Sequence, residues 1–337
     1  MRYQWPAPQA EQQERIGVLL INLGTPDAAE TGAVRRYLKE FLSDPRVVEA
    51  PRLLWWLILN GIILRTRPAR SAEAYRAVWT DNGSPLLDIS SRVARDLQDR
   101  LHDAADKPLA VVLAMRYGNP SIADGLETLR RANARRILVL PLYPQYSATT
   151  TASTFDRISE VLRGWRWIPE LRFINHYHDA PGYIEALAGS VERFQRHHGR
   201  PDRLLISFHG IPQEYADAGD PYPEECLLSA RLLAERLGLT PEQWQASFQS
   251  RLGNKPWLQP YTDETLRRWG GEGIGRVQVV CPGFPVDCLE TIEEIGQENR
   301  DYFLGAGGGD YRYIPALNDH PEHIGFLDAL IRNHLWR

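Results

Sequence analysis

The sequence predicts a doubly wound α/β fold, with two similar small parallel sheets flanked by helices and a central cleft between them. Short continuous apolar runs alternate with longer segments of helical period, which is typical of parallel strands covered on both faces. The two half-chains also share motifs: "LLINLGTP" (19–26) resembles "LLISFHGIP" (204–212), and "RILVLPLYP" (136–144) resembles "RVQVVCPGFP" (276–285). At about 150 residues per domain, 337 residues fit two domains.

Five strands are expected, at residues 16–24, 109–118, 136–144, 203–210 and 276–285. Helices are expected between them, for example over 121–134, where Leu126 and Leu129 share a face, and over 183–198. Ligands of such sheets bind beyond the carboxyl ends of the strands. The residues that end each strand are therefore the first candidates for a site.

The composition limits which partners the protein can bind and in which cellular compartment it is expected. The hydrophobic content is 43%, and the formal net charge is -4, so the basic surface that nucleic acids require is not indicated. Three scattered cysteines do not form a disulfide framework and favour a reducing cytoplasm. The first fifteen residues, "MRYQWPAPQAEQQER", lack an apolar core, so we expect no export signal.

The most apolar run is "LLWWLILNGIIL" at residues 53–64, followed by Arg65, Arg67 and Arg70. The run is shorter than the roughly 18 residues that a membrane-spanning helix needs. It is either a buried core helix with a solvated end or the mouth of a site for an apolar anionic ligand or an anionic membrane surface.

Nucleotide-binding loops are not supported. "GGEGIG" at 270–275 precedes a strand, whereas a dinucleotide fingerprint joins a strand to a helix, and "GAGGGD" at 305–310 is interpreted as a flexible connector. No Walker sequence is present.

His209 ends the fourth expected strand and is followed by Gly210 and Pro212, which leave its imidazole at the mouth of the sheet. A strand-end histidine often only bonds the backbone. Histidine is nevertheless the side chain that acts as a base or a metal ligand near neutral pH, because its ordinary pKa is about 6.5.

The stretch "CPGFPVDCLETIEEIGQEN" supplies acidic partners after the fifth expected strand. We expect an α-helix from near Asp287, and its steps of four residues keep Glu290, Glu294 and Glu298 on one face. Such like charges destabilise an isolated helix by roughly 0.2–0.5 kcal/mol per pair. One interpretation is a solvated helix whose first turn favours acids. The other is a path of oxygen ligands that leads a divalent cation toward the histidine.

The two cysteines of this stretch, Cys281 and Cys288, are soft-ligand candidates together with His209. Their spacing is wider than the two to four residues usual in zinc sites, and Cys281 directly follows a buried strand. We interpret both as packing residues.

Other histidines are interpreted as structural. His176 and His178 alternate along "INHYHD" and share a face if it is extended, and we interpret this segment as a strand edge near the domain boundary. His320 and His323 lack a nearby acidic partner in the sequence.

Five blocks resemble the ferrochelatase family: "INLGTPD", "LPLYPQYSATTTAST", "SFHGIP", "SRLGNKPWLQPYTDETL" and "CPGFPVDCLETIEEI". They occur in order and span nearly the whole chain. The resemblance implies a chelatase-like lyase that inserts Fe²⁺ into protoporphyrin IX to form protohaem, releasing two protons in the last step of haem biosynthesis. It also implies two Rossmann-like domains, residues 13–172 plus 318–337 and residues 173–317, because the family's C-terminal helix packs back on the first domain.

The resemblance assigns roles to particular residues. His209 and Glu290 match the family's catalytic pair, and Glu294 and Glu298 extend the metal path from them. The residues 53–64 would line the mouth and touch a membrane, so a cytoplasmic protein with peripheral membrane contact is expected. The porphyrin would be bound by Leu23, Arg65, Arg67, Tyr75, Ser84, Arg116, Tyr117, Tyr143 and Trp257.

The chain departs from some relatives in two places. Several carry histidine where this chain has Cys288, and some carry a cysteine-rich iron–sulfur extension, whereas this chain ends in "LIRNHLWR". We therefore expect no iron–sulfur cluster and no prosthetic group, with Fe²⁺ as a substrate. The alternatives are a chelatase for coproporphyrin or another tetrapyrrole, and a non-catalytic tetrapyrrole or metal carrier on the same fold.

Overall fold

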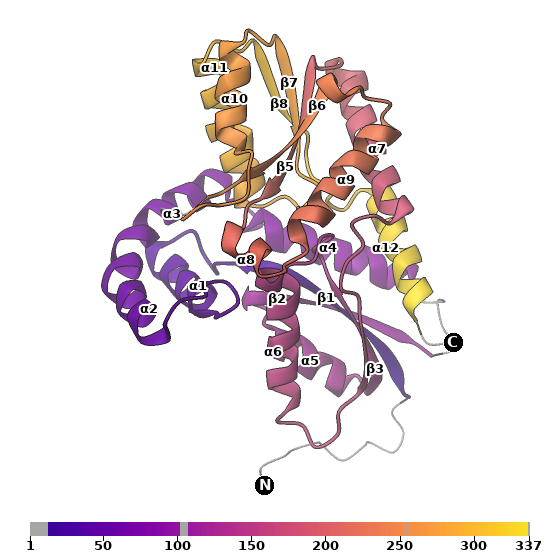
Figure 1. The fold of residues 1–337 in the computed structure, drawn as a ribbon. Helices are drawn as coiled ribbons and strands as arrows, with labels where there is room; N and C mark the ends of the chain where they lie inside the picture. Colours follow the sequence, from indigo (N-terminus) through magenta and orange to yellow (C-terminus); the bar gives the residue numbers. More distant parts are fainter. Residues whose placement is uncertain (1–12, 102–106, 252, 254, 336–337) are drawn as a thin grey trace. The chain divides into compact units, whose positions relative to one another are not determined.

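The computed structural model of the protein describes residues 13–101, 107–251, 253 and 255–335 (Figure 1). These residues form two compact units. The first comprises the described part of Met1–Leu142, Ala148–Asn175 and Ile324–Arg337, and the second comprises Tyr143–Ser147 and His176–His323. The domain boundaries expected from the sequence lie at 172/173 and 317/318, and the divisions between the two units of the structure lie three and six residues later, at 175/176 and 323/324.

The first unit contains a four-stranded parallel sheet in the order β2-β1-β3-β4. Its strands are β1 (Arg15–Thr25), β2 (Leu109–Gly118), β3 (Ala134–Pro141) and β4 (Glu170–Phe173). Its α-helices are α1 (Thr31–Ser43), α2 (Arg52–Ile58), α3 (Leu64–Val78), α4 (Pro85–Arg100), α5 (Ile122–Arg131) and α6 (Ser153–Leu162). Two π-helices are inserted, η1 (Leu59–Ile63) and η2 (Ala148–Ala152), and α12 (Pro321–His334) joins this unit from Ile324 onward.

The sheet of the first unit is covered on both faces, as its continuous apolar strands predict. Leu19 and Ile21 of β1 belong to one core cluster with Leu126 of α5 and Ile158 of α6. Asn22, the residue after Ile21, faces the other way, and its Nδ2 donates a hydrogen bond of 3.2 Å to a hydroxyl of α4. Alternate side chains of β1 therefore contact helices on opposite faces.

Gly24, at the end of β1, is required by the backbone. Its φ is +115°, and a Cβ there would lie 1.8 Å from the carbonyl oxygen of Tyr117 on β2. Only glycine permits both this conformation and this approach of two strand ends.

The second unit repeats the topology of the first, because its parallel sheet has the order β6-β5-β7-β8. Its strands are β5 (Arg203–His209), β6 (Trp244–Gln249), β7 (Arg276–Val280) and β8 (Asp310–Tyr313). Its helices are α7 (Pro181–His198), α8 (Gln213–Asp217), α9 (Tyr222–Arg236), the 3₁₀-helix η3 (Pro241–Gln243), α10 (Thr262–Gly271), the π-helix η4 (Glu290–Glu298) and α11 (Asn299–Gly305).

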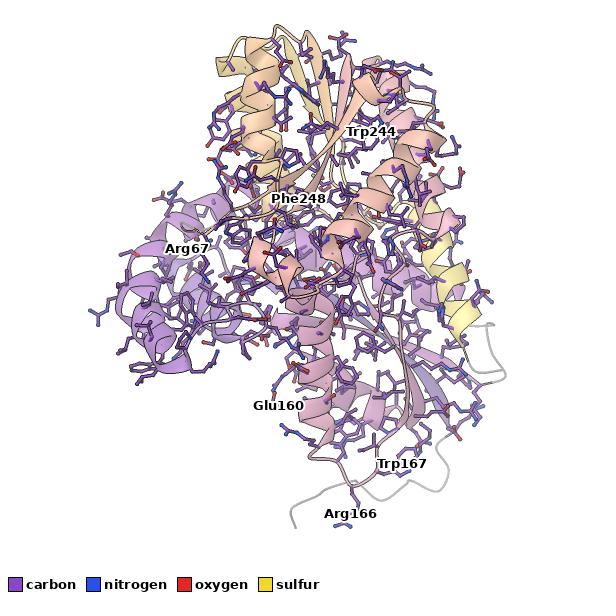
Figure 2. All side chains as sticks on the ribbon, in the orientation of Figure 1. Arg67, Glu160, Arg166, Trp167, Trp244 and Phe248 are labelled. Carbon is purple, nitrogen blue, oxygen red and sulfur yellow. The ribbon has the colours of Figure 1, made fainter. Side chains whose placement is uncertain are left out.

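Helices cover both faces of the second sheet, with α10 and α11 on one side and α7 and α9 on the other (Figure 1). The core under α10 and α11 contains Leu205 and Val279 from the strands and Trp269 and Phe303 from the helices. Cys281 belongs to the same core, which confirms that it is a packing residue. Figure 2 labels Trp244 at the start of β6 and Phe248 near its end.

The predicted fold class is confirmed, and all five expected strands are present. Two of them are shorter than expected: β3 ends at Pro141 and β7 at Val280. Each is followed by a proline-containing loop, and proline has no N–H with which to continue a ladder. The strands β4, β6 and β8 were not predicted. β4 and β8 have only four residues each and lie at sheet edges, so they carry little apolar pattern.

The apolar run at residues 53–64 is not a core helix, so that alternative is wrong. It forms α2, η1 and the start of α3, and within it Leu59 and Leu64 are buried. Leu53 is 76% exposed and Trp56 58% exposed, and further large apolar side chains beside them are exposed as well. Such a patch is typical of an interaction surface. In the described part of the chain, no helix is both long and apolar enough to cross a membrane.

Candidate functional site

The second sheet presents His209 at the carboxyl end of β5, beside Gln249 of β6. The amide of Gly210 donates a hydrogen bond of 2.7 Å to the carbonyl oxygen of Gln249, which holds the chain close as it leaves the strand. A Cβ at residue 210 would lie 3.0 Å from that oxygen and 3.2 Å from the Trp257 ring. Glycine therefore keeps the strand end narrow next to the histidine.

The tautomer of His209 follows from its hydrogen bond. Its Nδ1 lies 2.6 Å from the carbonyl oxygen of Gly210. Because a carbonyl oxygen can only accept, Nδ1 carries the proton and Nε2 carries the lone pair. The ring lies between two aromatic side chains, with its centroid 6.5 Å from that of Trp257 and 6.3 Å from that of Phe284. The histidine is thus oriented with a basic nitrogen available.

Burial lowers the pKa of His209 below its ordinary value of 6.5, although the negative charge of Glu290 and the hydrogen bond to Gly210 act in the opposite direction. Desolvation prevails because the charged imidazolium loses more hydration than the neutral ring. His209 is consequently neutral at pH 7, which is the form that accepts a proton or binds a metal ion.

The acidic segment after β7 is a π-helix, η4, so the predicted α-helix is wrong. Its N-cap is Leu289, two residues after Asp287, so the helix begins where it was expected and Glu290 lies in its first turn. Hydrogen bonds from i to i+5 widen each turn, so steps of four residues still follow one side of the helix. Glu290 and Glu298 both act electrostatically on Glu294, which confirms that the three acids lie near one another. Single π-turns often occur at functional sites.

Glu294 is held in an unusual protonation state. Burial and, to a smaller extent, the charges of Glu290 and Glu298 raise its pKa to about 7 against the lowering effect of hydrogen bonds from Ser250. The Ser250 hydroxyl donates to the Glu294 carboxylate. At neutral pH this carboxyl is therefore close to half protonated, and a cation that binds there would displace its proton.

A polar cavity of about 210 Å³ adjoins η4. Glu294 and Glu298 line it together with Ser250, Arg251 and Tyr302. The Arg251 guanidinium is neutralised by Asp263 at 3.1 Å and Glu264 at 2.8 Å, so the cavity keeps its acidic character. A larger cavity of about 440 Å³ lies beside the end of α7, and it contains none of the predicted site residues.

Gln249 connects the two strands to η4. Its Nε2 donates a hydrogen bond of 3.2 Å to the Glu290 carbonyl oxygen, and its Oε1 accepts one of 2.9 Å from the Ser207 hydroxyl. Ser207 lies on β5, two residues before His209. One side chain therefore fixes the start of the acidic helix relative to the strand that carries the histidine. The sequence gives no signal for this role, because Gln249 belongs to an unpredicted strand.

Asp287 anchors the loop that precedes η4. Its carboxylate accepts hydrogen bonds of 2.9 Å from Thr291, 2.6 Å from Tyr313 and 2.7 Å from Asn318. This buried carboxylate ties together the loop, the first turn of η4 and the chain after β8. The sequence pattern indicates only a place at the helix start for Asp287, because its partners are distant in the chain.

The cysteines near the site are thiols. Burial raises the pKa of Cys288, and the charge of Glu290 and a hydrogen bond to it raise the value further. Burial likewise raises the pKa of Cys281. Metals bind the thiolate form, so neither side chain is a ready ligand beside His209.

In the first unit, Arg116 and Tyr117 belong to an internal polar network. The Tyr117 hydroxyl is buried, donates to Asp44 over 2.8 Å and lies 3.1 Å from the Ser153 hydroxyl. Arg116 forms an ion pair with the same carboxylate. These contacts show how the end of β2 is held. Contact of either side chain with porphyrin stays a prediction.

The remaining predicted porphyrin ligands differ in exposure. Trp257 lies beside His209, as described above, and Tyr143 is buried within the second unit. In the first unit, Arg65 and Arg67 of α3 are exposed (Figure 2 labels Arg67), Leu23 is partly exposed, and Tyr75 and Ser84 are buried. The exposed arginines suit an anionic ligand, and the other contacts stay predictions.

The family model described as ferrochelatase matches residues 15–335 of the chain. The chain is 59% identical over 321 residues to the ferrochelatase of Thioalkalivibrio sulfidiphilus and 57% identical over 321 residues to that of Nitrosococcus oceani. Each alignment covers 95% of this chain and 87% of the relative.

Solved structures show the same fold at much lower identity. The sirohydrochlorin chelatase SirB from Bacillus subtilis subspecies spizizenii, in complex with cobalt, has a TM-score of 0.52 and 12% identity, covering 94% of this chain and 93% of its own. CbiX, described as the terminal enzyme of sirohaem biosynthesis in denitrifying bacteria, has a TM-score of 0.50 and 14% identity, covering 95% and 100%. These likenesses support the fold, and the match over residues 15–335 together with the two close relatives shows that this chain belongs to the ferrochelatase family.

Proposed function

We propose that the protein inserts Fe²⁺ into protoporphyrin IX, forming protohaem and releasing two protons. The observation that carries this proposal is the state of His209, a neutral imidazole whose Nε2 lone pair lies within the electrostatic influence of Glu290. In a chain of the ferrochelatase family, a fixed base beside a carboxylate supports metal insertion more than metal or porphyrin transport, because a carrier needs no proton acceptor.

The residues account for the proton balance of the reaction. The two inner N–H groups of the porphyrin must each lose a proton before the four nitrogens bind Fe²⁺, so one divalent cation replaces two protons. Nε2 of His209 accepts a proton as a general base. Glu290 stabilises the His209 imidazolium that results. It then takes the proton from the imidazole and passes it toward solvent, which returns His209 to its neutral form. Binding that bends the macrocycle exposes its N–H groups to such a base.

Iron approaches along the acidic side of η4 in this proposal. Glu294 and Glu298 line the polar cavity beside that helix, and carboxylate oxygens together with imidazole suit Fe²⁺. Fe²⁺ is a substrate here, held transiently and passed toward Glu290 and His209. Because Glu294 ionises near pH 7, its proton leaves as the cation arrives, which favours weak and reversible binding.

On the porphyrin side, we assign the propionates to the exposed arginines of α3, Arg65 and Arg67, because their positive charge suits an anionic group. Trp257 is proposed to contact the porphyrin macrocycle next to His209. No iron–sulfur cluster takes part in the proposal, since a cluster usually needs four cysteine ligands and the three cysteines of this chain are buried thiols.

A cytoplasmic protein in peripheral contact with the membrane is also proposed. The exposed apolar side chains of α2 and η1 precede the exposed Arg65 and Arg67, and apolar groups beside positive charge favour an anionic bilayer surface. Cosedimentation with anionic and with neutral vesicles tests this contact. We expect binding to anionic vesicles that Leu53→Asp combined with Trp56→Asp abolishes. Equal sedimentation of that variant would contradict the contact.

The substrate is tested by anaerobic incubation with Fe²⁺ and either protoporphyrin IX or coproporphyrin III, following the absorbance of the metallated product. We expect a higher kcat/KM for protoporphyrin IX, because the exposed apolar surface favours the less charged ring. A preference for coproporphyrin III would assign the alternative substrate, and binding without turnover of either porphyrin would favour the carrier.

A further inference from the structure

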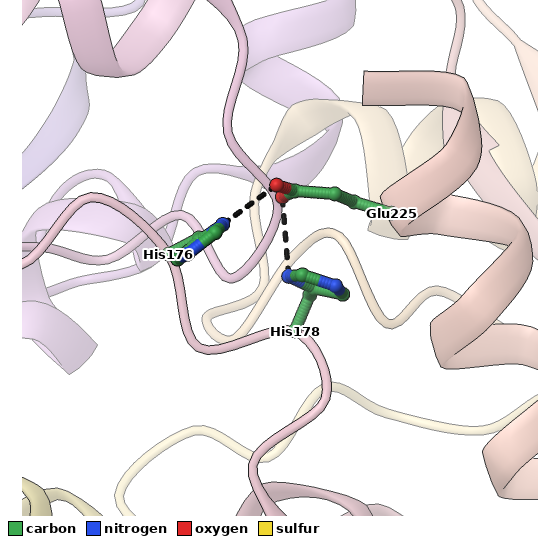
Figure 3. A group of neighbouring side chains, drawn as sticks. All are labelled: His176, His178 and Glu225. Atoms are coloured by element: carbon green, nitrogen blue, oxygen red, sulfur yellow. Dashed lines mark hydrogen bonds and ion pairs between the residues drawn. The ribbon is translucent and has the colours of Figure 1, made fainter. Parts of the chain in front are cut away.

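A second histidine–carboxylate cluster lies in the second unit, formed by His176, His178 and Glu225 (Figure 3). The two histidines occupy the segment between β4 and α7, and Glu225 lies in the first turn of α9. The interpretation of "INHYHD" as a strand edge is wrong, because residues 174–180 are not in a strand. The cluster shares no residue with the site at His209 and Glu290.

The three side chains converge on one point. His176 Nδ1 lies 2.6 Å from Glu225 Oε1, and His178 Nδ1 lies 3.2 Å from Glu225 Oε2. The two imidazole centroids are 5.1 Å apart. One ligand atom from each residue lies within 4.8 Å of the other two. Two imidazole nitrogens and a carboxylate thus surround a small volume.

Within the described part of the chain, one nitrogen of His178, Nδ1, is left without a hydrogen bond. His178 is 5% exposed, and its Nδ1 has no hydrogen-bond partner among the described residues, because the contact with Glu225 is close but not aligned as a hydrogen bond. Leaving a buried polar atom unpaired costs about 1–3 kcal/mol. Figure 3 shows this nitrogen directed at the carboxylate. A buried nitrogen that is aimed into the cluster and makes no hydrogen bond there indicates a ligand.

Surrounding groups hold two of the three residues in place. The amide of Tyr146 donates a hydrogen bond of 2.7 Å to Glu225 Oε2, and the Ser229 hydroxyl donates one of 2.8 Å to the His178 carbonyl oxygen. Glu225 is 8% exposed. Burial acts to raise the pKa of Glu225, but the close imidazole of His178, the amide of Tyr146 and the imidazole of His176 outweigh it and keep the pKa below its ordinary value. The carboxylate is therefore anionic at neutral pH.

We propose that His176, His178 and Glu225 form a binding site for a divalent transition-metal ion such as Zn²⁺, Co²⁺ or Fe²⁺. Two imidazoles and one carboxylate are a common ligand set for these ions, whereas Ca²⁺ and Mg²⁺ prefer oxygen ligands alone. Tetrahedral coordination separates ligand atoms by about 3.3 Å, so the His176–Glu225 hydrogen bond opens when the ion binds. The His176 side chain is 52% exposed and has room for this movement.

The ion would replace the hydrogen bond between His176 and Glu225 with bonds from each residue to the metal. His178 is already fixed, Glu225 is held by the Tyr146 amide, and His176 closes over the ion from the exposed side. Three protein ligands leave a fourth position for water. Because the ion joins the segment before α7 to α9, binding also raises the thermal stability of the protein.

The test uses Co²⁺, whose visible d–d absorption reports nitrogen ligands and tetrahedral geometry. The parent protein is the double variant His209→Ala with Glu290→Gln, which weakens metal binding at the other site. We expect this parent to bind one equivalent of Co²⁺ with a tetrahedral d–d spectrum and a raised Tm. Adding His176→Gln and His178→Gln should remove the spectrum and the Tm increase. The matched control adds His197→Gln and His198→Gln, two neighbouring histidines outside the cluster, and should leave both unchanged.

Two results would overturn the site: no Co²⁺ spectrum in the parent, or an unchanged spectrum after substitution of His176 and His178. If the variant with both substitutions does not fold, His176→Gln alone decides the question, because this half-exposed side chain is dispensable for packing. It should weaken Co²⁺ binding by at least about tenfold, and wild-type affinity in that folded variant would also contradict the proposal.

Discussion

The two units have the same backbone plan but different chemistry at equivalent positions. The two sheets have equivalent strand orders, β2-β1-β3-β4 and β6-β5-β7-β8. In the first sheet, β3 is followed by a proline-containing loop and the π-helix η2. In the second sheet, the equivalent strand β7 is followed by a proline-containing loop and the π-helix η4. The strand ends differ, with Leu23 and Gly24 on β1, and with His209 as the last residue of β5 and Gly210 directly after it. The π-helices differ as well, since η2 reads "ATTTA" and η4 reads "ETIEEIGQE".

This comparison shows that the π-helix and the strand-end glycine belong to the fold, whereas the base and the acids are additions to one copy. Because η2 forms without a single acid, a π-helix at this position of the fold does not require carboxylates. The fold supplies two equivalent positions at the carboxyl ends of the sheets. We propose that the side chains present at one of them carry the function.

The largest effect among the acids is expected for Glu290. Glu290→Gln removes the negative charge that stabilises the imidazolium of His209, so we expect kcat for iron insertion to fall about 100-fold, in the range typical of a lost acid–base partner. Stopped-flow absorbance of the metallated product measures this change. Glu293→Gln, on the same π-helix but outside the row of three acids, is the control and should retain nearly full activity. Equal losses in the two variants would mean that η4 acts only by its general charge.

Asp287 tests whether the acidic helix depends on its anchor. Asp287→Ala leaves the hydroxyls of Thr291 and Tyr313 and the amide of Asn318 without their buried acceptor, so we expect the free energy of unfolding to fall by about 3 kcal/mol. Urea denaturation followed by tryptophan fluorescence measures it. Tyr313→Phe removes one of these bonds and should cost about 1 kcal/mol. A loss for Asp287→Ala no greater than that of Tyr313→Phe would contradict the anchoring role.

A smaller, pH-dependent effect is expected for Glu294. Its pKa is raised to about 7 by burial, so its charge is lost as the pH falls from 8 to 6, and KM for Fe²⁺ should rise several-fold over that interval. Glu294→Gln should have a high KM at every pH in this range. Initial rates under anaerobic conditions at saturating porphyrin give both profiles. A wild-type KM that does not change with pH would show that Glu294 is not on the iron path.

The same carboxyl affects stability with a definite sign. Its pKa is higher in the folded protein than the ordinary 4.5, so folding favours the protonated form, and the cost of burying the carboxylate grows as the pH rises from 4.5 to 7. We expect Glu294→Gln to be more stable than wild type at pH 8, by at most roughly 3 kcal/mol, and to lose that advantage near pH 4.5. The opposite order in urea denaturation would contradict the burial of this carboxyl.

The sequence predicted those features that depend on local pattern. The continuous apolar strands, the repeat and the row of acids after β7 could all be read directly, since each is encoded by neighbouring residues. Gln249 and Asp287 were not recognised as site residues, because their partners are distant in the chain and their roles exist only after folding. Glu225 lies about fifty residues from His176 and His178, so no spacing rule unites them. The π geometry of η4 was also missed, because α and π turns share steps of four residues.

The central claim is that His209 is the base on which metal insertion depends. It is tested most directly by comparing wild type and His209→Ala in anaerobic single-turnover insertion of Fe²⁺ into protoporphyrin IX, with porphyrin binding measured by fluorescence quenching. His197→Ala, a change of an exposed histidine on α7, is the control. We expect His209→Ala to bind porphyrin and to unfold like wild type but to insert iron at least about 100-fold more slowly. Insertion at a rate near that of wild type in the folded variant would contradict it.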